Sequence, residues 1–196
     1  MKTLIWEPLS GASGDMILGS LIGLGADRDK VCDAIESTVD VSVVIGTADK
    51  RGIAATDVRI DVDHETHSRH YDELVSIIQQ AGLPGDVEKS ALGVFAIMAA
   101  AESAVHGQDL ETLHFHEVGQ NDALADVIGA CTAIHDLGAE AVCCLPINVG
   151  GGQVKAAHGL MPVPAPATLD ILRKSGLPFY GTGSRELLTP TGAALM

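Results

Sequence analysis

Apolar and polar positions follow two different periods along the chain, and these predict a mixture of helices and strands. Apolar residues recur every three or four positions in several segments, which is the spacing of one helix face. These segments are 15–25, 28–38, 71–82, 86–107, 122–138 and 166–176. Short β-prone apolar stretches predict strands over 2–9, 112–118 and 141–150. Over 41–63, apolar and charged residues alternate on both sides of the turn DKRG, which predicts a two-stranded ribbon.

Residues at the expected helix ends agree with this pattern. Ser13 is placed to cap the helix that starts near Asp15, and Asn121 to cap the helix over 122–138. Thr189 and Pro190 suit the N-cap and first position of a last helix, but only six residues follow Pro190. Because so short a helix is marginal alone, we expect a further segment or partner chain to complete it. The fold class predicted is α/β or α+β, a mixed sheet with flanking helices in a single compact domain over 1–196.

Composition and charge narrow the possible partners. Hydrophobic residues make up 46% of the 196 residues and charged residues 19%, as in globular proteins. The net charge of −14 argues against nucleic acid or an anionic membrane as partner, because both are polyanions. It fits cation binding or a well-solvated acidic surface. The four cysteines have no CxxC spacing, and the first residues resemble no export signal, so we expect a cytoplasmic protein with reduced thiols.

Two histidine clusters are candidate metal sites. In HFHEVGQND (114–122), His114 and His116 share one face of the predicted strand, and Glu117 and Asp122 follow closely. Asp122 and Asp126 lie one helical turn apart, opposite the apolar stripe of their helix. The second cluster has a histidine at every third position: His64, His67 and His70. Imidazole is a ligand for nickel, zinc, copper or iron. Both clusters can equally be polar edges exposed to water.

Three small-residue or hydroxyl-containing segments are candidate binding sites for phosphate or another part of a substrate. The turn SGASGD offers backbone N–H groups at a helix start, with Asp15 beside it to hold a cation. A glycine-rich loop is followed by a lysine and a histidine, and a third segment has two threonines at a helix start. The candidates are Ser10, Gly11, Ser13, Gly14, Gly150, Gly151, Gly152, Lys155, His158, Thr189 and Thr191. Ordinary turns and helix caps explain the same residues.

Four motifs occur in a fixed order: SGASGDM, HFHEVG followed by an aspartate, VGGGQVKAAHGLMPVPAPAT and ELLTPTGAA. This set resembles the LarC family, the nickel insertion proteins that complete the nickel-pincer cofactor of lactate racemase and related enzymes. The resemblance implies CTP-dependent insertion of nickel into pyridinium-3,5-bisthiocarboxylic acid mononucleotide, with Ni–S and Ni–C bonds formed. Such an enzyme is a nickel chelatase or cyclometallase-type lyase. The alternatives are a non-catalytic module that binds or delivers nickel, and a divalent-metal phosphohydrolase.

The resemblance also implies roles for particular residues. His116, Glu117 or His158 would take the proton that the ring carbon loses, since a base works best with a pKa near the operating pH. The metal ligands would come from His114, His116, Glu117, Asp15 and Asp122, with His64, His67 and His70 as weaker candidates. Residues 1–196 would form the N-terminal nickel-insertion domain, without the C-terminal domain associated with CTP and its Mg or Mn. The expected partners are the pyridinium mononucleotide, that second domain or chain, and other copies in a homo-oligomer.

Overall fold

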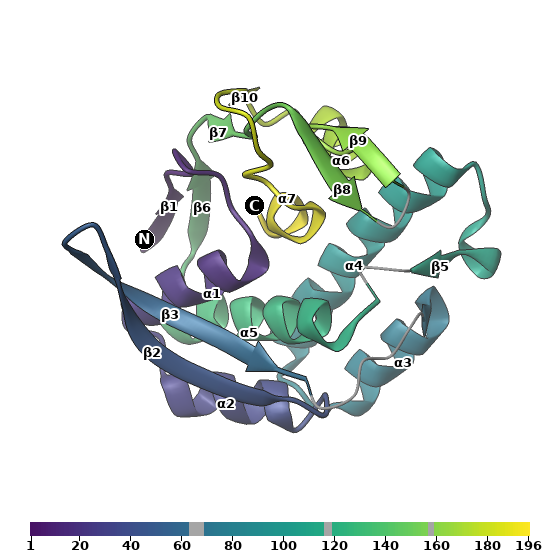
Figure 1. Cartoon of the computed structure of the whole chain (residues 1–196). Coiled ribbons are helices and arrows are strands. Elements are labelled where there is room, and N and C mark those ends of the chain that lie inside the picture. Colours follow the sequence, from purple (N-terminus) through teal and green to yellow (C-terminus); the bar gives the residue numbers. More distant parts are fainter. Residues whose placement is uncertain (63–68, 116–118, 157–158) are drawn as a thin grey trace.

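The centre of the fold is helix α5 (Asn121–Leu137), which other helices surround (Figure 1). The computed structural model describes residues 1–62, 69–115, 119–156 and 159–196. Helices α1, α2, α4 and α7 pack against α5, and almost all of its residues from Asn121 to Ala133 are buried. A helix that is covered on nearly all sides belongs to the core. The prediction that Asn121 caps this helix is wrong by one residue, because Gln120 occupies the N-cap position.

The remaining helices confirm the segments predicted from the apolar period. They are α1 (Gly14–Gly23), α2 (Arg28–Glu36), α3 (Tyr71–Gln80), α4 (Gly85–His106), α6 (Pro166–Ser175) and α7 (Pro190–Leu195). A short 3-10 helix, η1, covers Leu110–Thr112. Ser13 and Thr189 occupy the predicted N-cap positions of α1 and α7. Thr189 Oγ1 accepts a hydrogen bond from the Gly192 N–H at 3.1 Å, as a capping hydroxyl should.

The strands within the described ranges pair in twos. Two pairs are parallel: β1 (Thr3–Trp6) with β6 (Ala141–Cys144), and β7 (Ile147–Asn148) with β10 (Phe179–Tyr180). Three pairs are antiparallel: β2 (Ser42–Lys50) with β3 (Ile53–Asp61), β4 (Arg69–His70) with β5 (His114–Phe115), and β8 (Gln153–Ala156) with β9 (Gly159–Pro162). The mixed helix-and-strand class and the ribbon over 41–63 are confirmed. The hairpin β8–β9 was not expected, because its glycines and prolines resemble a loop.

One hydrophobic core runs through these elements. It includes Leu18 and Leu21 of α1, Phe95 of α4, and Leu124 and Ile128 of α5, all nearly inaccessible to water. None of the helices within the described ranges has the length and apolar character needed to cross a bilayer. The core forms one continuous cluster, and the β2–β3 ribbon lies along α1 (Figure 1).

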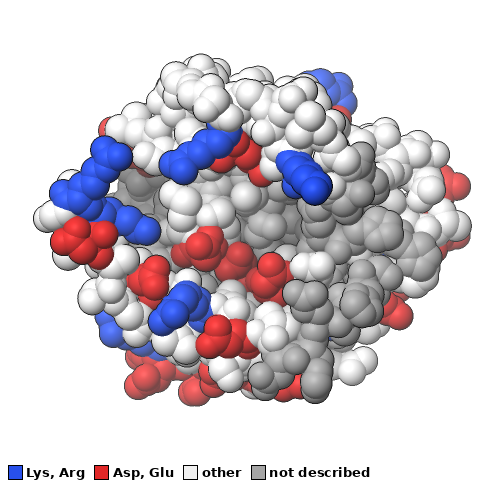
Figure 2. Space-filling view, viewed as in Figure 1, with Lys and Arg blue, Asp and Glu red and all other residues white. Residues whose placement is uncertain are grey.

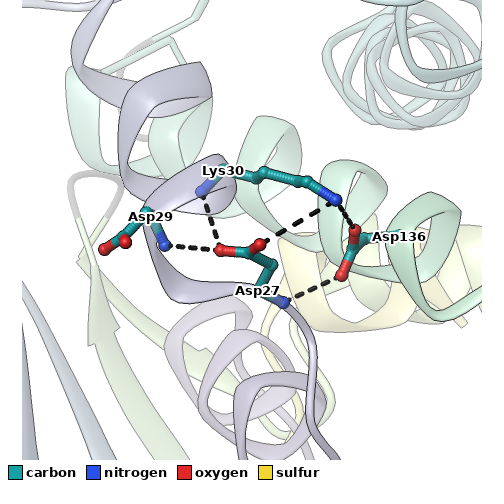
Figure 3. Close-up of polar contacts among 4 residues, drawn as sticks. All are labelled: Asp27, Asp29, Lys30 and Asp136. Atoms are coloured by element: carbon teal, nitrogen blue, oxygen red, sulfur yellow. Dashed lines mark hydrogen bonds and ion pairs between the residues drawn. The ribbon is translucent and has the colours of Figure 1, made fainter.

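A polar network joins the start of α2 to the last turn of α5 (Figure 3). The Asp27 side chain caps α2 by accepting hydrogen bonds from the N–H groups of Asp29 and Lys30. Asp136 of α5 accepts from Lys30 Nζ at 2.6 Å and from the Asp27 N–H at 2.9 Å. These hydrogen bonds, with the Lys30 contact the larger cause, lower the pKa of Asp136.

We expect Asp136→Asn to lower the thermal midpoint at pH 7 by at most a few degrees, because the network lies at the surface. A carboxylate with a lowered pKa stabilises the fold above its ordinary pKa and loses that effect as the pH falls through the lowered value. Thermal unfolding at pH 7 and pH 2.5 measures this, and the variant should match the parent protein at the lower pH. Asp29→Asn is the control, since that carboxylate points away from the network in Figure 3. An equal loss at both pH values would contradict the prediction.

Candidate functional site

Three of the sequence motifs lie side by side, although two of them are about 175 positions apart in sequence. The Ala12 N–H donates to Leu187 O at 2.9 Å, and the Thr189 N–H donates to Ala12 O at 3.1 Å. On the other side of the same segment, the Gly151 N–H donates to Arg185 O at 3.0 Å. The backbones approach closely because glycine lacks a side chain: a Cβ on Gly11 would lie 1.9 Å from Leu187 O. The SGASGD, NVGGG and RELLTPTG segments therefore form one packed unit.

A cleft of about 610 Å³ opens beside this unit. The starts of α1, α5 and α7 and the end of β3 line it. The lining residues are Ser13, Gly14, Asp15, Val58, Arg59, Ile60, Asp61, Gln120, Asp122, Ala123, Asp126, Glu186, Thr189, Pro190 and Thr191. Figure 2 shows acidic side chains gathered across the middle of this face, with lysines and arginines around them.

Helix starts give the cleft donors for an anion. Helix α1 begins at Gly14 and α5 at Asn121, and the N–H groups of a first helical turn have no partner inside the helix. The partial positive charge of a helix N-terminus favours a phosphate or carboxylate there. The hydroxyls of Thr191 and Ser13 lie on the same lining, although Ser13 Oγ donates to the Asp15 carboxylate. Two of these N–H groups already donate to carboxylates, that of Asp15 to Asp126 and that of Ala123 to Asp122 Oδ1, so an anion bound at this wall would share it with them.

Carboxylates occupy the same cleft. Asp15, Asp122, Asp126 and Glu186 all line it, and Asp61 lies at the end of β3. The charges of Asp15 and Asp122 act unfavourably on an ionised Asp126, and a cation bound beside these carboxylates would relieve that repulsion. The cleft therefore combines acceptors for a cation with donors for an anion.

Asp126 is the most unusual of these acids. Burial first, and then the charges of Asp15 and Asp122, raise the pKa of its carboxyl to about 8, although an N–H of Asp15 donates to it. Its Oδ1 is buried and has no hydrogen-bond partner among the described residues. The side chain lies directly against Gly14, where an added Cβ would be 2.1 Å from Asp126 Oδ2. The alternative that both aspartates lie on a solvated face does not hold for Asp126, because neighbouring elements cover α5 on nearly all sides.

Sequence reasoning named neither Glu186 nor Arg59 as a site residue. Among the described lining residues Arg59 is the one lysine or arginine, and its Nε lies 3.6 Å from Asp57 Oδ2. Glu186 precedes LLTPTG, and its place in that motif was the available signal. Arg59 gave no signal, because a charged residue alternating with apolar ones on a strand is ordinary. The signal for Asp126 was its position between small and apolar residues in ALADVIGA.

The structure brings six of the predicted site residues together in the cleft: Ser13, Gly14, Asp15, Asp122, Thr189 and Thr191. Several others lie elsewhere. Ser10 and Gly11 line a separate apolar groove, and Lys155 is exposed on β8. Gly150, Gly151 and Gly152 pack against the backbone of 183–187.

Only some of the predicted histidines lie within the residues that the structure describes. His70 is the N-cap residue of α3, and its N–H donates to Glu73 Oε2 at 3.0 Å. The backbone of His70 also pairs with that of His114. His64, His67, His116, Glu117 and His158 lie outside the described residues. In the described part of the chain, no three histidine, cysteine, aspartate or glutamate side chains form a group that can hold a metal ion. The histidine ligands thus stay a prediction.

Comparison with known proteins gives a consistent result. A family model described as nickel insertion protein matches residues 4–196. A protein named for nickel insertion from Methanococcoides burtonii is 57% identical over 196 residues, and one from Methanosarcina barkeri is 56% identical over 198. A similarly named protein from Thermomicrobium roseum is 40% identical over 200 residues. The match to each of these three relatives covers the whole of this chain.

The solved structures contain no significant match to this chain. The chain spans about half the length of the curated relatives it matches: 50% of the first two relatives named above and 49% of the third. The match of the family model to nearly every residue, together with these identities, establishes the relationship. The chain belongs to the nickel insertion protein family.

Proposed function

We propose that this chain takes part in CTP-dependent insertion of nickel into pyridinium-3,5-bisthiocarboxylic acid mononucleotide, and that the acidic cleft is where ion and substrate meet. The observation that carries the proposal is that one cleft contains both groups that can bind an anion and carboxylates that can bind a cation. Helix starts and hydroxyls favour the substrate's phosphate, while Asp15 and Asp122 favour the cation. The cleft's volume of about 610 Å³ lies within the usual range for small-molecule sites.

In this proposal nickel is a substrate that the chain holds and then gives up. Carboxylates from Asp15 and Asp122 would bind it together with imidazoles, and the predicted ligands His114, His116 and Glu117 would supply the rest. His64, His67 and His70 are the second candidate group. Imidazole and carboxylate suit nickel, and the substrate's thiocarboxylates are softer ligands that can take the ion from them.

Closing the pincer also requires removal of a proton from the pyridinium ring carbon that bonds to nickel. We propose His116, Glu117 or His158 as the acceptor of that proton. Thr189 and Thr191 are proposed to contact the substrate, while Gly11, Gly150, Gly151 and Gly152 let the backbone segments beside them pack closely. The reaction is that of a nickel chelatase or cyclometallase-type lyase.

The relatives contain a second half that this chain does not cover, and a different role is proposed for it. We propose that it binds CTP with Mg or Mn, that the complete protein is cytoplasmic, and that it forms a homo-oligomer. A second candidate function is that this chain binds nickel and delivers it to a separate catalytic chain, and the carboxylates gathered in the cleft would support nickel binding in either case. Adding in trans the half of a relative that this chain does not cover separates the two. Metallation only with both halves and CTP indicates a divided enzyme, and nickel transfer without nucleotide indicates delivery.

We expect Asp15→Asn and Asp122→Asn each to weaken nickel binding about tenfold, corresponding to roughly 1.4 kcal/mol, because each removes a carboxylate from the cleft. Isothermal titration of the chain with nickel chloride measures this. Asp86→Asn is the matched control, since Asp86 also lies in the first turn of a helix but outside the cleft. The double variant His114→Ala, His116→Ala tests the predicted imidazoles in the same titration. Unchanged affinity in both aspartate variants would place the ion elsewhere.

A further inference from the structure

An apolar groove of about 430 Å³ shares no lining residue with the acidic cleft. One side consists of residues 5–12, which include the second half of β1 and the loop after it. The other side is the outer face of α1 with Met16 and Ser20, followed by its C-cap residue Leu24, and Met196 also lines the groove. The groove therefore lies between a strand and a helix, which is the shape that accepts an extended segment.

Large apolar side chains in this groove are unusually open to water. Ile5 is 61% exposed, Leu9 61%, Leu24 62% and Met16 47%. Single exposed apolar residues are ordinary, but several gathered in one groove mark a surface that another polypeptide covers. Trp6 lies in the same groove, and its indole N–H is buried without a hydrogen-bond partner among the described residues.

The strand edge beside the groove is also open. Trp6 O accepts from the Leu145 N–H at 2.9 Å and Lys2 O accepts from the Glu140 N–H at 2.8 Å, so these residues face β6. Alternate residues of a strand face opposite edges, and the N–H and C=O groups of Thr3 and Ile5 therefore point away from β6. Within the described ranges β1 pairs with β6 alone. Such an edge is a template for a further strand.

We propose that this groove binds an extended apolar segment that adds to β1 as a third strand, and that the segment belongs to the half of the family protein that this chain does not cover. The relatives are about twice as long as this chain, and their second half is of sufficient length to supply such a segment. Parallel sheets are normally covered on both faces, whereas Ile5 of the β1–β6 pair is exposed. Main-chain hydrogen bonds to Ile5 and apolar contacts with Leu9, Met16 and Leu24 would fix the segment in place.

Copurification tests the proposal. This chain carries an affinity tag and is coexpressed with the half of the Methanococcoides burtonii relative that it does not cover. The two polypeptides should copurify, and Ile5→Asp or Leu24→Asp should reduce the recovered partner at least tenfold. Ile53→Asp is the matched control, because Ile53 is 71% exposed at the β2–β3 turn and does not line the groove. Failure of the parent pair to copurify, or equal recovery with the groove variants and the control, would overturn the proposal.

Hydrogen exchange of the parent complex gives a measurement that does not depend on the stability of any variant. The Ile5 amide should exchange at least tenfold more slowly in the complex than in the chain alone, while the Ile53 amide should be unchanged. An Ile5 amide that exchanges at the same rate in both samples would overturn strand addition. Sedimentation of the chain alone adds a further test: a dimer that Ile5→Asp dissociates would assign the groove to a second copy instead.

Discussion

Replacing Asp126 by asparagine should make the metal-free protein more stable than its parent at pH 8. The free energy of unfolding of the variant, relative to that of the parent, should be about 3 kcal/mol more favourable at pH 8 than at pH 4. The pKa of this buried carboxyl is raised from 3.8 to about 8, so the folded protein holds a proton there that the unfolded chain has released. The stability that this proton gives is fully present below pH 3.8 and is lost as the pH rises through about 8. The full shift corresponds to at most about 6 kcal/mol, and relaxation around a buried charge reduces it.

Urea denaturation at pH 4 and pH 8 tests this prediction. The parent protein should lose stability over this interval more steeply than Asp126→Asn, which has no proton to release at this position. Asp122→Asn is the control, because Asp122 is exposed on the same helix, and it should keep most of the parent's dependence. The prediction fails if the parent and Asp126→Asn have the same dependence on pH.

Gly11→Ala should destabilise the protein by about 3 kcal/mol or more and abolish measurable nickel binding. Gly11 has a φ of +78°, which disfavours any side chain, and a Cβ there would lie 1.9 Å from Leu187 O. The strained φ alone costs roughly 1–2 kcal/mol, and the backbone clash adds to it. Because the clash is with backbone, it must push the 185–189 segment away from the start of α1, and so open the wall of the cleft.

Gly183→Ala is a closely matched control. Its φ of +81° carries the same strain, but an added Cβ would have no atom within 4 Å. Urea denaturation of both variants, with nickel titration under native conditions, separates strain from the clash. We expect Gly183→Ala to lose only about 1–2 kcal/mol and to keep its nickel affinity. Equal losses in the two variants would mean that the contact between Gly11 and Leu187 contributes nothing of its own.

The sequence predicted the helices well because their information is local. The apolar period of α4 and the Thr189 cap of α7 each depend on residues within a few positions of one another. The hairpin β8–β9 was not predicted, because its local glycines and prolines favour a loop. The pairing of the two strands outweighs that local tendency. Local sequence patterns cannot show which short segments will pair with each other as strands.

The site was predicted in part. Asp15 and Asp122 lie in the cleft as expected of site residues, because both follow directly from motifs at helix starts. The burial of Asp126 could not be predicted, since a helical wheel shows which side of a helix is polar but not how many neighbours cover it. Arg59 comes from the ribbon, and only the packing of β3 along α1 brings it to the cleft. Sequence periodicity contains no such information.

The contact between residues 11–12 and 187–189 has a consequence for synthesis of the protein. The cleft needs both segments, and the ribosome adds about 5–20 residues per second, so the second segment emerges roughly 10–35 seconds after the first. During that interval the helix start at Gly14 has no opposing wall. A nascent chain therefore cannot assemble the cleft before residues 187–189 are translated, and any ligand of the complete cleft must bind after that step.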